Sequence, residues 1–81
     1  MNPAQKIIEK FGTAKIIADG IGVKVEAVYK WTYPRERSGT DGFIPVGQQV
    51  KVINLAKKLG VELKAEDFFE DGVFDQEAPN S

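Results

Sequence analysis

Twenty residues in the first half of the chain decide the fold: residues 14–33 read AKIIADGIGVKVEAVYKWTY. Over the first eight, the apolar side chains recur at spacings of three, one and three, which predicts one buried stripe on a short helix. The residues of this stripe are Ala14, Ile17, Ala18 and Ile21. Gly22 ends that helix, and apolar residues then return at every third position, at Val25, Val28 and Trp31. The sequence therefore predicts two helices joined by a tight turn.

A further helix is expected before this pair, over residues 3–11. Asn2 can cap it, and Pro3 suits a first helical position because its missing N–H would be unpaired there. Gly12 ends it, and Thr13 is placed to cap the helix that follows. These signals predict a helix on either side of Gly12.

After Trp31 the chain changes character. Residues 32–42 hold one proline and two glycines without apolar periodicity, which predicts a loop with basic residues at its front. Pro45 then opens a helix of about four turns that reaches Gly60. The stripe expected to face inward on this helix consists of Val46, Val50, Ile53, Ala56 and Leu59. A short helical turn over residues 65–69 is expected to close the core with its aromatic side chains.

These elements predict an all-α fold, a compact bundle of about five short helices containing a helix-turn-helix. An 81-residue chain has room for one domain, which we place at residues 1–69. Residues 70–81 have few apolar side chains to bury, so we expect them to form a flexible acidic tail.

Composition narrows the possible functions. The chain contains no cysteine and no histidine, so the commonest general base, the commonest metal ligand and thiolate chemistry are all missing. We therefore expect no enzyme activity, no catalytic residue, no metal and no cofactor. The chain also lacks a stretch apolar enough for a signal peptide or a membrane span, so we expect a cytoplasmic protein without a membrane partner.

Charge is segregated along the sequence. Residues 1–60 carry ten Lys/Arg and five Asp/Glu, a net charge of +5, whereas residues 61–81 carry one lysine and seven acids, a net charge of −6. A basic body with an acidic end suggests an anionic partner for the body. Uneven charge that arose by chance is the alternative.

The stretch 14–33 resembles the helix-turn-helix of Cro-like phage repressors. In that family a small residue midway along the first helix allows close crossing, and Ala18 stands at that position; a glycine takes the turn four residues later, as Gly22 does here. Lys24-Val25 departs from the polar residues that the family usually has at the start of the second helix. With its flanking helices, the resemblance covers residues 3–69.

The resemblance implies that the second helix, at about residues 24–32, enters the major groove of DNA. Its implied base contacts are Lys24, Val25, Glu26, Tyr29 and Lys30. The implied contacts to the DNA backbone are Lys15, Arg35, Arg37, Ser38 and Thr40. Without DNA, the same residues would form an ordinary solvated helix face and an exposed loop.

Two other features of the sequence do not form a ligand site. The acidic cluster Glu66, Asp67, Glu70 and Asp71 lacks the alternating oxygen ligands of a calcium loop and lies at a helix start, where acids are favoured anyway. The glycines at positions 12, 20 and 22 do not form a phosphate-binding loop, since no strand precedes them.

The function implied is sequence-specific DNA binding by a transcriptional regulator, a repressor of phage or mobile-element type. Its expected partner is double-stranded DNA, a pseudo-palindromic operator bound by a homodimer. Phe69, Val73 and Phe74 are the candidates for pairing. The alternative is a protein-interaction module, an antitoxin or adaptor that keeps the fold without binding DNA.

Overall fold

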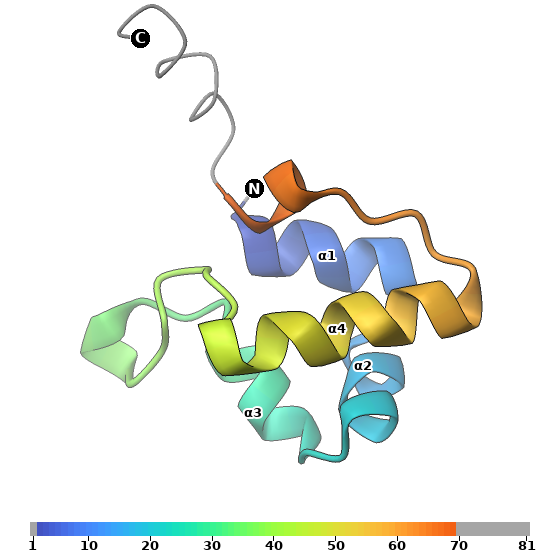
Figure 1. Cartoon of the computed structure of the whole chain (residues 1–81). Coiled ribbons are helices and arrows are strands. Elements are labelled where there is room, and N and C mark those ends of the chain that lie inside the picture. Colours follow the sequence, from blue (N-terminus) through green and yellow to red (C-terminus); the bar gives the residue numbers. More distant parts are fainter. Residues whose placement is uncertain (1, 70–81) are drawn as a thin grey trace, which may run out of the picture.

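The computed structural model describes residues 2–69, and throughout this range the only regular elements are helical (Figure 1). Four of them are α-helices: α1 (Pro3–Phe11), α2 (Ala14–Ile21), α3 (Val25–Lys30) and α4 (Val46–Leu59). Two are short 3-10 turns, η1 (Arg35–Arg37) and η2 (Ala65–Phe68). The all-α class is confirmed, with η2 standing where the fifth helix was expected. The acidic tail, including Val73 and Phe74, lies outside the described residues.

The starts of α1 and α2 are fixed by the side chains that the sequence indicated. The Gln5 amide donates to Asn2 Oδ1 at 2.8 Å, and the Ile16 amide donates to Thr13 Oγ1 at 3.3 Å. Each cap satisfies one of the N–H groups that a helix start leaves unpaired. Both predicted caps are therefore confirmed.

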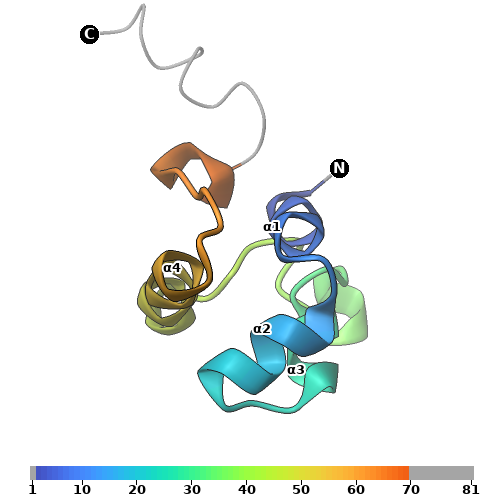
Figure 2. The same cartoon turned by 90° about the vertical axis from the view of Figure 1, so that its right-hand side faces the viewer.

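Helix α2 is the central element, because it contacts α1, α3 and α4. Figures 1 and 2 show α2 and α3 together at one end of the domain, with α1 and α4 on different sides above them. The turn η2 packs against α1 at the other end. The described helices include none long and apolar enough to cross a membrane.

The core lies where these helices meet. Its fully buried side chains include Ile7 of α1, Ile17 of α2, Val28 of α3 and Val52 of α4. Trp31, directly after α3, is only 5% exposed, and Phe68 of η2 is buried as well. The core position of Trp31 agrees with its helical spacing from Val28. Of the two aromatic side chains expected to close the core at residues 65–69, Phe68 is buried, whereas Phe69 is 41% exposed.

Helix α4 begins and ends near the expected residues, but it turns a different side to the core. Its buried side chains are Val52, Leu55 and Ala56, whereas Val46 is 79% exposed and Val50 is 62% exposed. Of the predicted inward stripe, only Ala56 is buried and Ile53 partly so; Leu59 is half exposed. The predicted stripe was wrong because α4 carries apolar residues on two sides, and its neighbours cover only one.

Two valines of α4 are exposed, and so are two aromatic residues outside the helix. We call Phe43, Val46, Val50 and Phe69 the outer row. Each of the four side chains is at least one third exposed to solvent in the single chain, and Phe43 and Val46 line the same shallow hollow. Exposed apolar side chains are typical of interaction surfaces where they form a continuous patch.

The segment between α3 and α4 is a loop, as predicted, but it is held firmly. The Ala4 amide donates to the Gly42 carbonyl at 2.7 Å, and Asn2 Nδ2 donates to the Thr32 carbonyl at 3.3 Å. The Asp41 amide donates to the Tyr33 carbonyl at 2.9 Å. These bonds tie the loop to the start of α1 and to itself.

Replacing Trp31 by alanine removes the largest side chain of the core. We expect Trp31→Ala to lower the free energy of unfolding by roughly 3–5 kcal/mol, since the surrounding helices cannot fill the resulting cavity. Urea denaturation followed by circular dichroism measures this loss. A variant as stable as the wild type would contradict the burial of the indole.

The two sides of α4 can be compared with one substitution. Val52→Ala should destabilise the domain by about 1.5–3 kcal/mol, because it empties buried space, whereas Val46→Ala should change stability by less than about 0.5 kcal/mol. Thermal and urea melts of both variants provide the measurement. If Val46→Ala lowers the free energy of unfolding as much as Val52→Ala or more, the side of α4 predicted from the sequence is the buried one.

Candidate nucleic-acid interface

The helix-turn-helix unit begins with α2 and turns at Gly22. Gly22 has φ +79° and ψ +35°, in the left-handed region that glycine adopts without strain. The amides of Gly22 and Val23 both donate to the Ala18 carbonyl, at 2.9 and 3.0 Å. This pair of bonds closes the end of α2 and aims the chain into α3.

Small residues on α2 allow its neighbours to come close. Ala18, which the sequence indicated for this role, is 1% exposed. Gly20 has the same role toward α4, because a Cβ atom at Gly20 would collide with the side chain of Leu55. No pattern in the sequence indicated this second close approach, since a glycine inside a helix does not reveal which neighbour it accommodates.

Helix α3 has a buried side and a polar exposed side. Val28 is fully buried, whereas Lys24, Glu26, Tyr29 and Lys30 are exposed, with Tyr29 at 47%. Glu26 and Lys30 lie one helical turn apart, and neither forms an ion pair with any residue from 2 to 69. Four of the five predicted base-contact residues are therefore exposed: three on α3 and Lys24 directly before it.

Val25, the fifth of these residues, is less exposed than the other four. Its side chain is partly buried and packs against the core, so it does not stand fully on the outward face. The physical reason is the spacing of three between Val25 and Val28, which turns both toward α2. Lys24, which precedes α3, supplies no side-chain cap to the helix.

The two loop arginines both contact neighbouring side chains. Arg35 Nε lies 2.9 Å from Asp41 Oδ2, and the Arg35 amide donates to Asp41 Oδ1 at 2.8 Å. The guanidinium of Arg37 stacks over the Tyr33 ring, 4.8 Å from its centre. Both arginines remain exposed, so these contacts orient them without burying their charge.

The other predicted backbone contacts differ in availability. Lys15 pairs with Asp19 along α2, with 3.0 Å between Nζ and Oδ2, and Ser38 is exposed at the end of η1. Thr40 is different, because it is half-buried and the carbonyl oxygens of Trp31 and Phe43 both lie within hydrogen-bond distance of its hydroxyl. The single hydroxyl proton is shared within the loop, so in this arrangement Thr40 has no proton left to donate to a phosphate.

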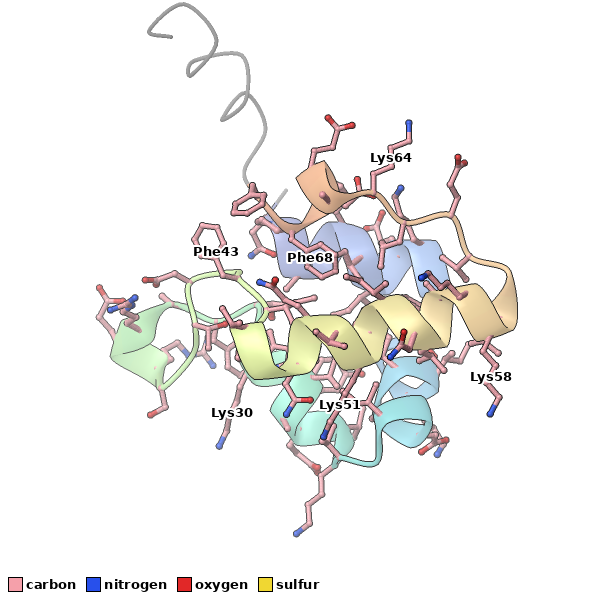
Figure 3. All side chains as sticks on the ribbon, in the orientation of Figure 1. Lys30, Phe43, Lys51, Lys58, Lys64 and Phe68 are labelled. Carbon is pink, nitrogen blue, oxygen red and sulfur yellow. The ribbon has the colours of Figure 1, made fainter. Side chains whose placement is uncertain are left out.

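Sequence reasoning assigned no DNA contact to the lysines of α4. Figure 3 shows Lys51 and Lys58 projecting from α4 toward the same lower side of the domain as Lys30. The available signal was their separation of seven residues, which returns a helical side chain to nearly the same side. It was not decisive without knowing which side of α4 is buried.

The acidic cluster is structural where it is described. Asp67 is 8% exposed; its Oδ2 accepts from the Lys64 amide at 2.8 Å and lies 3.1 Å from Lys10 Nζ. Burial by itself raises the pKa of Asp67, but the Lys64 amide and the Lys10 ammonium outweigh that effect and lower it from the usual 3.8. Glu70 and Asp71 lie outside the described residues. In the part that is described, no three acidic side chains gather as metal ligands.

No protein-family model, curated protein or solved structure matches this chain.

The lowered pKa of Asp67 predicts a loss of stability in acid. A carboxyl whose pKa is lower in the folded state stabilises the fold above its unfolded pKa, and this contribution disappears as the pH falls through the folded value. We expect the melting temperature to decrease when the pH is lowered below about 4. In Asp67→Asn, stability should already be reduced at pH 7, and this component of the acid loss should be absent.

Glu66→Gln is the control, because Glu66 is the exposed neighbour of Asp67 in η2. Between pH 7 and pH 2, the melting temperature of this control should stay close to that of the wild type. Identical pH profiles for the wild type and Asp67→Asn would show that the pair with Lys10 does not stabilise the fold.

Proposed function

We propose that this protein is a sequence-specific DNA-binding transcriptional regulator of the Cro-like helix-turn-helix kind. The observation that carries the proposal is the exposed face of α3. Glu26, Tyr29 and Lys30 are exposed on α3, and Lys24 is exposed directly before it, without ion pairs to other described residues, while Val28 is buried in the core. A helix mounted in this way offers polar groups to a ligand at little cost in conformational entropy.

The chemistry of this face suits base edges in the major groove. A lysine donates to O6 and N7 of guanine, and a glutamate accepts from N4 of cytosine. Alternating donors and acceptors favour sequence reading over attraction by charge alone. The net charge of +5 on residues 1–60 supplies the general attraction to DNA.

Arg35, Arg37 and Lys15 are proposed to contact phosphates on either side of this face. Arg35 and Arg37 sit on η1, a short distance along the chain from the end of α3, and both are exposed. Their contacts with Asp41 and Tyr33 hold each guanidinium in place without covering it. Such residues position a protein on DNA and carry no sequence information.

A homodimer on a pseudo-palindromic operator is part of the proposal, since one such domain covers a single half-site. Phe69, one of the expected pairing residues, is exposed and belongs to the outer row. Phe43, Val46 and Val50 add to that apolar surface. The outer row is our candidate for the pairing surface.

The same outer row favours a second candidate function, a protein-interaction module without DNA binding. In that case the row would hold a different protein, and the α3 face would be an ordinary solvated surface. DNA binding by the full chain distinguishes the two functions.

The experiment separates base reading from phosphate contact. A preferred duplex is first selected from random-sequence DNA with the full chain. Tyr29→Ala or Lys30→Ala should then cost about 1–3 kcal/mol on the selected duplex and much less on random DNA. Arg35→Ala or Arg37→Ala should lower the affinity for the selected duplex and for random DNA alike. Each should also reduce the slope of log affinity against log salt by up to about one unit.

Two outcomes would contradict the proposal. If all four variants change the affinity for both DNAs identically, α3 does not lie in the major groove. Failure of the wild type to bind any duplex at low salt, together with capture of a protein partner that depends on Val46 or Val50, would establish the interaction module instead.

A further inference from the structure

Two lysines of α4 share one side of that helix. Lys51 and Lys58 are seven residues apart, so their directions differ by only about 20° around the axis. Both line a shallow hollow of about 280 Å³ between α2 and α4, whose other lining residues are Gly20, Ile21, Asn54 and Leu55. The two ammonium groups thus flank the end of α2.

Neither lysine is neutralised by the part of the domain that the structure describes. Lys51 and Lys58 form no ion pair with residues 2–69, and no acid lines the hollow between them. Asp19 lines an adjoining hollow with Lys58. Asp19 is already paired with Lys15 at 3.0 Å.

The hollow between α2 and α4 lies near the start of α3, the helix proposed to contact the bases. Gly20 and Ile21, which line the hollow, end α2 directly before the turn at Gly22 that leads to Lys24. Figure 3 shows Lys30, Lys51 and Lys58 directed to the same side of the domain. A duplex held against α3 therefore has these cations at its flank.

We propose that Lys51 and Lys58 bind the phosphate backbone of the duplex beside the groove that α3 occupies. The inference rests on the proposed function and adds a second backbone contact to it. The two residues are about 10 Å apart along the helix, so each can neutralise a separate phosphate. Asn54, between them at the edge of the hollow, has an amide that can donate to the same backbone.

The close approach at Gly20 makes this surface possible. Because Gly20 has no side chain, α4 packs against α2 with Leu55 directly over the glycine. The lysine side of α4 is thereby brought to the α2 edge. A longer side chain at position 20 would push α4, and its lysines, away from the unit that contains α3.

Lys57 provides a matched control. It is adjacent to Lys58 and is exposed as Lys58 is, but it points about 120° away from Lys51 around the helix. Both Lys57 and Lys58 lie in the last turn of α4, so glutamine at either position removes the same favourable charge from the helix end. Any difference between the two variants in DNA binding therefore reports on direction, not on net charge.

The test titrates the full chain and the variants Lys51→Gln, Lys58→Gln, the double variant and Lys57→Gln with the selected duplex and with random duplex at several salt concentrations. We expect Lys51→Gln and Lys58→Gln each to lower the affinity for both duplexes equally, by about fivefold to tenfold at 0.1 M salt. Each should flatten the salt slope by about one unit, and the double variant by about two. Lys57→Gln should change neither quantity by a comparable amount.

Three outcomes would overturn the inference, and they separate it from the proposed function. If DNA binds and depends on Lys30 while the three single glutamine variants behave alike, the inference fails and the proposed function stands. If the double variant loses only its preference for the selected duplex, the lysines read bases and do not hold phosphates. If the wild type binds no duplex, both proposals fail. Equal melting temperatures for all the variants serve as the control for folding.

Discussion

The packing of α2 against three neighbours is the constraint on which the rest of the structure depends. An eight-residue helix presents little surface, and α1, α3 and α4 must all contact it. This is possible because Ala18 is small and Gly20 has no side chain where Leu55 approaches. The six-residue α3 is too short to be stable alone, so its position follows from this packing.

Mounting α3 in this way links stability to the proposed function. Val28 and Trp31 enter the core from α3 and its end, which leaves the polar residues of the helix facing water. The loop after Trp31 is tied back to α1 through Asn2 and Ala4, so η1 and its arginines are also held in position. A face held from both ends needs little ordering when it meets a rigid partner such as a duplex.

Helix α4 has three groups of side chains in different surroundings. Val52, Leu55 and Ala56 close the core, Lys51 and Lys58 border α2, and Val46 and Val50 form an apolar row on another side. A single helix thus separates a cationic edge from an apolar surface. In the function proposed above, DNA would contact the cationic edge and a second protein chain would contact the apolar row.

The sequence by itself determined the elements, because local signals are sufficient for them. Asn2 and Thr13 cap their helices, Gly22 turns the chain, and the spacing of Val28 and Trp31 places them in the core. The exposed α3 residues followed from the same periodicity. Only the tertiary structure decided which side of α4 is buried, that Val25 packs inward and that Thr40 is committed to the loop. The physical reason is that burial depends on which neighbour covers a side chain, and α4 has apolar residues on two sides with equally good helical spacing.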